Sequence, residues 1–424
     1  MKHSDVKYAQ YLEILREELI PAMGCTEPIA MAYAAAKARQ VLGKMPEKID
    51  IVISGNIIKN VKSVVVPNTG GMKGITAAVA AGVVVGDPNK QLEVLADVKA
   101  EDIPKIAEFI SNCEMTVMKA SSSKMLDIDL SLYAGEDSVR LRICDYHTNI
   151  VLIEKNGEVL HEADADGDAD SETDRSVLNV RDILDFAESV DLECVRELLE
   201  KQIEYNLAIS EEGLRGEYGA AIGKTLLETR GDDVRVRARA QAAAGSDARM
   251  SGCELPVVIV SGSGNQGMTA SLPVVVYALD MHATHEQLLR ALVVSNLITI
   301  HQKTPIGRLS AFCGAVSAGC GAAAGVAWLT EGTYEAVSQT IKNTLGMISG
   351  TVCDGAKPSC ATKIASAVEA GLLGFDLYEK GKALHGGDGI LKDDVERTIE
   401  SVGQLAREGM RETDEEILDI MLEE

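Results

Sequence analysis

The spacing of apolar residues changes twice along this chain, and this change restricts its fold more than any other feature. Residues 126–133 and 139–144 alternate apolar and polar side chains, as half-buried antiparallel strands do. Residues 150–155 and 158–161 flank Asn156–Gly157, a strong hairpin signal because both turn positions need positive φ. Helical patterns precede and follow this region. The sequence therefore predicts an α+β fold, in which a mainly helical domain (1–45 plus 177–424) carries an inserted α+β domain (46–176) with an antiparallel sheet.

Local patterns refine this prediction. Helical spacing and alanine content predict helices over residues 27–42, 74–85 and 100–112, and apolar runs predict strands over residues 49–54 and 61–66. Residues 163–176 are acidic and almost without apolar side chains, which predicts a connector or loop. A further short apolar run, at residues 255–260, interrupts the helical region.

Charge and cysteine content exclude several classes of function. The chain has 41 Lys and Arg against 65 Asp and Glu, a net charge of −24, which argues against nucleic acid or an anionic membrane surface as partner. We find no run of the roughly 18 uncharged apolar residues that a membrane span needs, and the N-terminal helix has no apolar signal region. Nine cysteines, an odd number, fit a reducing cytosol. These features predict a cytoplasmic protein.

Three cysteines on two glycine-rich segments are the first candidate site. Cys313 opens CGAVSAGCGAAAG, and Cys353 and Cys360 enclose CDGAKPSC. Thiolates are the usual ligands of iron–sulfur clusters and structural zinc, and six intervening residues with Gly355 and Pro358 allow two sulfurs to converge. Cys320, two helical turns after Cys313, could point at the same centre. The alternative is that these thiols are small buried residues of a close-packed helical core.

A glycine-rich turn is the second candidate. Gly262, Gly264 and Gly267 form a G-x-G-x-x-G pattern between a strand-like and a helix-like segment, which is the context of a dinucleotide-binding fingerprint. The segment after Ala278 is helical, however, rather than the next strand of a βαβ unit. The other interpretation is that a turn of small residues opening a helix binds a carboxylate through its backbone N–H groups.

Cys25, in PAMGCTEP, is the third candidate. It follows Gly24 in a turn that looks exposed and precedes a helix, whose N-terminus would lower the thiol pKa, although Glu27 in the first turn works against this. Cys25 is therefore either a reactive thiol or a packing residue at the start of the helix.

Six segments together resemble a known family. They are PAMGCTEPIA from Pro21, PNTGGMKGI from Pro67, HTNIVLIEKNG from His147, SGSGNQG from Ser261, LSAFCGAVSAGCGAAAG from Leu309 and TVCDGAKPSC from Thr351. In this order they resemble the L-cysteine desulfidase family, also called the YhaM (UPF0597) family, which is related to the iron–sulfur L-serine dehydratases. GCTEP and CDGAK with a second cysteine are specific, whereas SGSGNQG alone is not.

The resemblance implies a catalytic helical domain that carries a [4Fe–4S] cluster. On the desulfidase pattern the ligands are Cys313, Cys353 and Cys360, whereas an alignment with the dehydratases would make Cys320 the first ligand. Cys25 lies where the desulfidases have their catalytic cysteine, and the dehydratases have a serine-rich turn there that this chain lacks. The resemblance also implies a homodimer.

The implied reaction is α,β-elimination of L-cysteine to pyruvate, ammonia and hydrogen sulfide. The amino-acid substrate would be bound by side chains and amides of the glycine-rich turn and by the inner edge of the inserted domain: Ser261, Ser263, Gly264, Asn265, Asn68 and His147. The alternatives are an iron–sulfur L-serine dehydratase, a nicotinamide-dependent oxidoreductase built on Gly262–Gly267, and a non-enzymatic amino-acid-binding protein.

Overall fold

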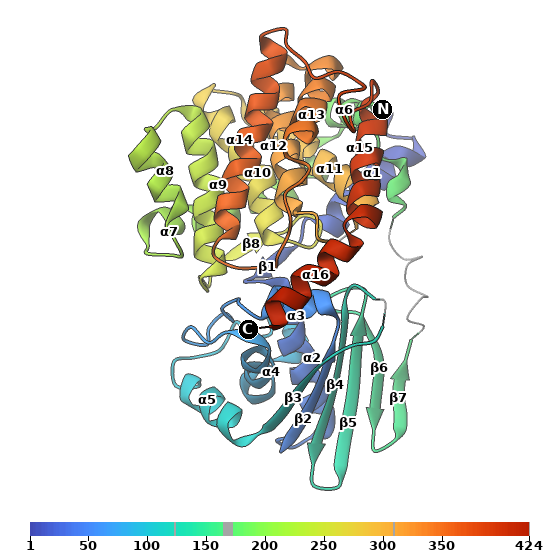
Figure 1. The fold of residues 1–424 in the computed structure, drawn as a ribbon, viewed down its shortest axis with the longest axis vertical. Helices are drawn as coiled ribbons and strands as arrows, with labels where there is room; N and C mark the ends of the chain where they lie inside the picture. Colours follow the sequence, from blue (N-terminus) through green and yellow to red (C-terminus); the bar gives the residue numbers. More distant parts are fainter. Residues whose placement is uncertain (123, 164–172, 308–309, 424) are drawn as a thin grey trace.

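The computed structural model describes residues 1–122, 124–163, 173–307 and 310–423. A mainly helical part lies above a smaller part built on a six-stranded sheet (Figure 1). The α+β class is therefore confirmed. Residues 164–172 of the predicted acidic connector, and Leu309 in one of the matching motifs, lie outside the described residues.

The six-stranded sheet has the order β3-β2-β4-β5-β6-β7. Its strands are β2 (Lys48–Ile53), β3 (Glu114–Lys119), β4 (Asp127–Ala134), β5 (Asp137–Cys144), β6 (Ile150–Lys155) and β7 (Glu158–Glu162). All neighbouring pairs are antiparallel except β2 and β3. The predicted hairpin is confirmed, since Asn156 and Gly157 have φ of 53° and 83° between β6 and β7.

Helices cover one face of this sheet (Figure 1). Alternate side chains of β2, β4 and β5 are buried, α2 packs on β4 and β5, and α4 packs in turn against α2. This part contains α2 (Thr26–Leu42), α3 (Gly55–Val61), α4 (Gly74–Val85) and α5 (Ile103–Asn112). The domain boundaries stay a prediction. The sequence grouped residues 1–45 with the helical part, whereas α2 packs into the core of the sheet because nearly all its sides are apolar.

The predictions from the sequence were wrong for two elements of this part. The predicted strand at 61–66 is the end of α3 followed by a loop, in which only Val65 forms a β-bridge, to Lys73. Strand β3 was not predicted, because it lies at the sheet edge with largely exposed side chains and has no apolar alternation.

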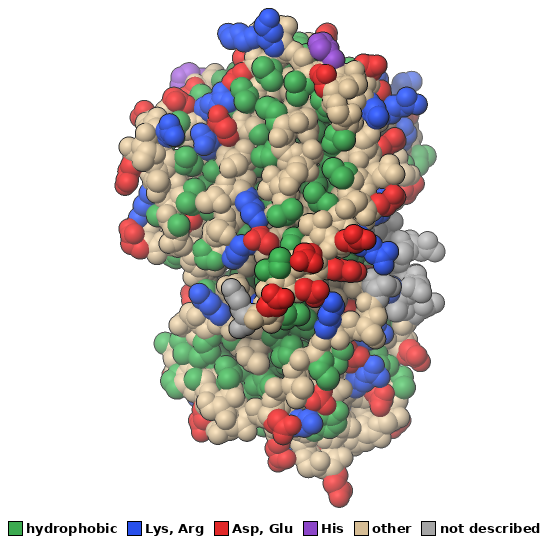
Figure 2. Space-filling view, viewed as in Figure 1, with side chains coloured by type: hydrophobic (Ala, Val, Ile, Leu, Met, Phe, Trp, Pro, Cys, Tyr) green, Lys and Arg blue, Asp and Glu red, His purple; other side chains and the backbone are tan. Residues whose placement is uncertain are grey.

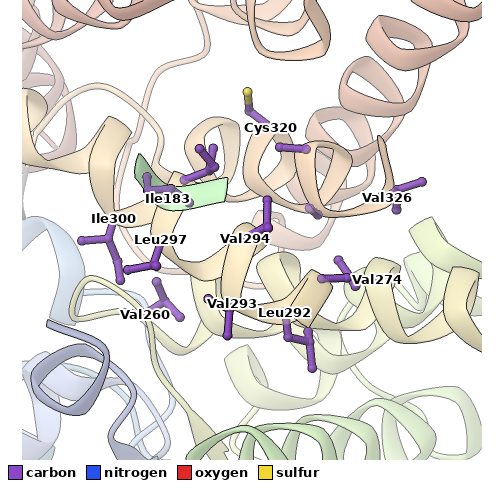
Figure 3. Packing of buried hydrophobic residues seen from close by; sticks show 14 of the residues in the cluster. Ile183, Val260, Val274, Leu292, Val293, Val294, Leu297, Ile300, Cys320 and Val326 are labelled. Carbon is purple, nitrogen blue, oxygen red and sulfur yellow. The ribbon is translucent and has the colours of Figure 1, made fainter. Parts of the chain in front are cut away.

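The helical part is built around α12 (Gly314–Glu331), whose alanine and glycine side chains allow close approach of its neighbours. A Cβ on Gly321 would lie 2.6 Å from the carbonyl oxygen of Ser295, so only glycine fits there. Figure 3 shows Cys320 with valines and leucines of this core. The other helices are α1 (Val6–Glu18), α6 (Val180–Ser189), α7 (Arg196–Arg215), α8 (Ile222–Arg230), α9 (Val234–Met250), α10 (Gly264–Asp280), α11 (His285–Ile306), α13 (Tyr334–Ile348), α14 (Cys360–Glu379) and α15 (Val395–Gln404).

Among the described residues, β1 (Pro21–Met23) and α16 (Arg411–Leu422) both connect the two parts. Strand β1 pairs antiparallel with β8 (Pro256–Val258) just before α2. Helix α16 crosses from the helical part to α3, where Lys59 pairs with Asp414. Acidic side chains gather on the exposed face around α16 (Figure 2). Short 3₁₀ turns occur at Pro88–Glu93, Arg175–Val177 and Leu192–Cys194, and a π turn at Leu405–Gly409.

Candidate active site

A cavity of about 140 Å³ is lined by residues of both parts of the molecule. The sheet part contributes Cys25, Asn60 and His147, and the helical part contributes the glycine-rich turn and the cysteine segments. Segments that lie more than 300 residues apart in the sequence therefore form one site.

The three cysteines on the glycine-rich segments all line this cavity. Two backbone hydrogen bonds hold the first two segments together: Cys313 N–H donates to Thr351 O (3.0 Å) and Cys353 N–H donates to Ala311 O (2.6 Å). The loop after Cys353 turns at Gly355, whose φ is 91°, and leads into α14, which begins at Cys360. Cys313, Cys353 and Cys360 thus line one cavity, and their convergence on one centre and their role as ligands stay a proposal.

Cys320 lies elsewhere. Its side chain is fully buried in the helical core, where its Sγ is 3.9 Å from the carbonyl oxygen of Ile341, and it is not among the residues that line the cavity. Burial raises the pKa of its thiol to about 12. The position of Cys320 is that of a small core residue.

Four helices begin at the cavity. The first or capping residues of α2, α10, α12 and α14 line it: Thr26, Ser263, Gly314 and Cys360. Helix N-termini carry partial positive charge and unpaired N–H groups, which stabilise anions. The cavity is therefore suited to negatively charged groups such as thiolates or a carboxylate.

The donor set fits an iron–sulfur cluster better than a single metal ion. Among the described residues, no group of three or more His, Cys, Asp or Glu side chains is close enough to share one ion. Cysteines of a four-iron cluster each bind a different iron, so their sulfurs do not need to meet at one point. Burial, followed by the neighbouring Cys353 and Cys360, raises the pKa of the Cys313 thiol to about 12, so binding a cluster would release thiol protons.

Cys25 caps α2 and lines the cavity, but its environment differs from the sequence prediction. The residue is only 4% exposed rather than in an exposed turn. Burial, and then the Glu27 carboxylate, raise the pKa of the Cys25 thiol well above its usual value, while the charge of Arg249 acts to lower it. The Sγ–H donates to Glu27 Oε2 at 3.1 Å. The predicted lowering of this pKa by the helix terminus is therefore wrong, because desolvation outweighs it.

The glycine-rich turn joins β8 to α10. Ser261 and Gly262 have φ of 49° and 75°, and Ser261, Ser263 and Asn265 line the cavity. Strand β8 belongs to a two-stranded antiparallel sheet, so the parallel βαβ context of a dinucleotide fingerprint is absent from the described residues. Gly264 is not itself in the lining. A Cβ there would lie 2.5 Å from Arg249 Nε, so this glycine leaves room for the arginine.

Arg249 is a lining residue that the sequence analysis missed, and Gln266 is one that it included only as part of SGSGNQG, without singling it out. Arg249 lies in the last turn of α9 and is 3% exposed, and Gln266 lies in the first turn of α10 and is 6% exposed. For Arg249 the only sequence signal was a charged residue inside AAAGSDARM, a run of small residues typical of close helix packing. That signal does not show which cavity the side chain enters.

The two predicted residues of the inserted domain differ in position. His147 lines the cavity, and a Cβ on Gly262 would lie 3.8 Å from its Cε1. Asn68, with φ of 61°, lies in a turn outside the lining, where its Nδ2 donates to Leu95 O at 2.7 Å. Asn68 therefore stabilises the fold of its loop rather than contacting the cavity.

Comparison with known proteins identifies the family of the chain. The family model of the serine dehydratase alpha chain matches residues 89–419. The chain belongs to this family. It is also 56% identical to the UPF0597 protein of Desulfitobacterium hafniense over 423 residues, covering 100% of this chain and 98% of that protein. The UPF0597 proteins of Lachnoclostridium phytofermentans (53% over 415 residues, 98% and 100% covered) and Treponema denticola (48% over 425 residues, 99% of each) are similar throughout.

The family supports two general conclusions. It is that of the iron–sulfur serine dehydratases, so the chain is a member of a lyase family, and the family suggests an iron–sulfur cofactor. Among the described helices, none combines the length and apolar character needed to cross a bilayer.

Proposed function

We propose that the protein is an iron–sulfur-dependent lyase that converts L-cysteine and water to pyruvate, ammonia and hydrogen sulfide. The observation that carries the proposal is the convergence of Cys313, Cys353 and Cys360 with a fourth cysteine, Cys25, on one cavity at four helix N-termini. The family match supports the lyase class. Cys25 supports a thiol substrate, since the resemblance implies a serine-rich turn at this place in the dehydratases.

Cys313, Cys353 and Cys360 would hold a [4Fe–4S] cluster, which when bound supplies a Lewis-acidic iron for the leaving sulfur. Elimination breaks the Cα–H and Cβ–S bonds. The sulfur leaves as hydrogen sulfide after taking up a proton, and water then converts the aminoacrylate to pyruvate and ammonia.

The chain itself provides the proton acceptor. Cys25 is the candidate for removal of the Cα proton, and Glu27 Oε2 already accepts the hydrogen bond of its Sγ–H. Glu27 is held by Thr26 Oγ1 (3.0 Å) and Asn60 Nδ2 (3.2 Å), so its carboxylate is fixed beside the thiol. Transfer of the thiol proton to Glu27 would give the thiolate that acts as base, with the charge of Arg249 favouring it.

A second candidate function is L-serine dehydration, which the family match favours. The two substrates differ only in the leaving atom, so one experiment tests both. The protein is reconstituted anaerobically with iron and sulfide, freed of excess sulfide, and assayed for pyruvate and sulfide with each amino acid.

We expect equal amounts of pyruvate and sulfide from L-cysteine, together with iron-dependent brown colour. Pyruvate from L-serine but not from L-cysteine would assign the dehydratase instead. If neither amino acid gives pyruvate in a protein that retains its iron, the lyase proposal is wrong, and specific binding without turnover would support an amino-acid-binding protein.

A further inference from the structure

Arg249 is a buried cation that forms no ion pair with the described carboxylates. Its guanidinium lines the cavity, and its one hydrogen bond within the described residues is from Nη1 to Asn265 Oδ1, at 3.2 Å. Its Nε is buried and has no acceptor among the described residues, and none of their carboxylates forms an ion pair with the guanidinium. Burying a charge is costly unless it is paired. The unpaired guanidinium therefore indicates that an anionic group of a ligand completes this site.

Gln266 has a buried amide oxygen, Oε1, that accepts no hydrogen bond from the described residues. The amide lies against the first residue of α12, since a Cβ on Gly314 would be 2.6 Å from Gln266 Cδ and 2.8 Å from its Oε1. Gly314 directly follows Cys313, so this unpaired acceptor lies beside the cysteine segment.

Two glycines make room for these two side chains. Gly264 is the first residue of α10, and any side chain on it would collide with Arg249, whereas any side chain on Gly314 would collide with Gln266. Neither glycine has a positive φ, so clearance rather than backbone conformation explains why no larger residue fits. The cavity thus combines an unpaired cation, an unpaired acceptor and the space that both need.

We propose that Arg249 and Gln266 recognise an α-amino acid, with the Arg249 guanidinium binding the carboxylate and the Gln266 amide oxygen accepting from the ammonium group. The choice of L-cysteine as ligand rests on the proposed function. Arginine suits this role because its planar donors match a carboxylate, and an unpaired acceptor beside it selects a ligand that also carries a donor.

Three thiols with different polar groups test the two contacts separately. L-Cysteine has both groups, 3-mercaptopropionate lacks the ammonium, and cysteamine lacks the carboxylate. Their binding to the cluster-loaded protein is measured by calorimetry under anaerobic conditions, for wild type, Arg249→Met and Gln266→Met. Arg237→Met, on the same helix but 39% exposed, and the exposed Gln404→Met serve as matched controls.

We expect Arg249→Met to weaken L-cysteine and 3-mercaptopropionate by about 10- to 100-fold and to leave cysteamine unchanged. Gln266→Met should weaken L-cysteine and cysteamine but leave 3-mercaptopropionate unchanged. The iron content should be that of wild type in both, and the controls should bind all three ligands normally. Equal weakening of all three ligands by either variant would overturn the role of that residue.

Gly264→Ala provides a second test if Arg249→Met does not fold, because its Cβ displaces the guanidinium while the charge remains. It should reproduce the ligand pattern of Arg249→Met, and normal binding of all three thiols in Gly264→Ala would count against the proposal. Binding and turnover separate the two hypotheses. The predicted binding pattern without sulfide release would retain the recognition pair and refute the desulfidase. Sulfide release from L-cysteine, with each variant weakening all three thiols equally, would retain the desulfidase and refute the recognition pair.

Discussion

Asp247 provides a quantitative test of the burial seen near the cavity. This carboxyl group on α9 is 1% exposed and accepts a hydrogen bond from Gly223 N–H at 3.1 Å, in the first turn of α8. Burial raises the pKa of Asp247 from 3.8 to about 6, although the backbone N–H groups of Gly223 and Ile222 act to lower it. The difference corresponds to about 3 kcal/mol favouring the neutral form in the folded protein.

The sign of the pH dependence follows from this shift. Between about pH 4 and pH 6 the folded protein keeps a proton on Asp247 that the unfolded chain has lost, so stability falls as the pH rises through this range. Above about pH 6 Asp247 is ionised in the folded protein as well, and the full loss of stability from burying its charge is present. Asp247→Asn keeps an acceptor oxygen for Gly223 N–H but cannot ionise. The free energy of unfolding of this variant should equal that of wild type near pH 4 and exceed it by up to about 3 kcal/mol at pH 7.5.

Chemical denaturation of preparations with equal iron content, at several values between pH 4 and pH 8, measures this difference. Asp232→Asn, an exposed substitution of the same kind, should change stability by less than about 0.5 kcal/mol at every pH. A constant difference between Asp247→Asn and wild type across the range would refute the reasoning, as would a variant that is less stable at pH 7.5.

Three further predictions concern the cysteines and the packing of α10. Cys313→Ala should lose iron and colour after reconstitution, whereas Cys320→Ala should retain both, as metal analysis would show; the opposite result would assign the first ligand to Cys320. Cys25→Ala should keep wild-type iron content and lose about 10²-fold or more in turnover, measured as pyruvate release, and unchanged turnover would remove it as the base. Gly267→Ala places a Cβ 1.9 Å from Val258 O, so it should lower stability in denaturation by about 1–3 kcal/mol, and a wild-type midpoint would contradict the observed packing.

The parts of the fold that could be predicted are those fixed by local chemistry. The hairpin at Asn156–Gly157 follows from the need for positive φ, and α4 from a run of small apolar residues that ends at a glycine. Strand β3 could not be predicted, because its pairing with β2 is parallel and joins segments 66 residues apart in register, such as Lys48 and Glu114. Such pairing depends on the rest of the fold rather than on the strand's own sequence.

The same distinction applies to the site. The cysteine segments could be recognised because thiols in glycine-rich loops are unusual, and the structure brings all three to one cavity. The pKa of Cys25 was predicted in the wrong direction, because a helix terminus is visible in sequence while burial by Val64 and Met250 is not. Arg249 was missed because its position depends on the clearance at Gly264, on a different helix.

The net charge of the whole chain is negative, whereas a buried guanidinium and four helix N-termini bring positive charge to the cavity. The net charge of the chain is −24, and acidic side chains surround α16 on the face shown in Figure 2. Salt screens such exposed charges beyond about 8 Å at physiological ionic strength. Inside the cavity, the Arg249 guanidinium and the N-termini of α2, α10, α12 and α14 lie close to any ligand and are screened much less. An acidic protein can therefore bind the carboxylate of an amino acid, because the groups within contact distance, rather than the sum over the chain, determine the local potential.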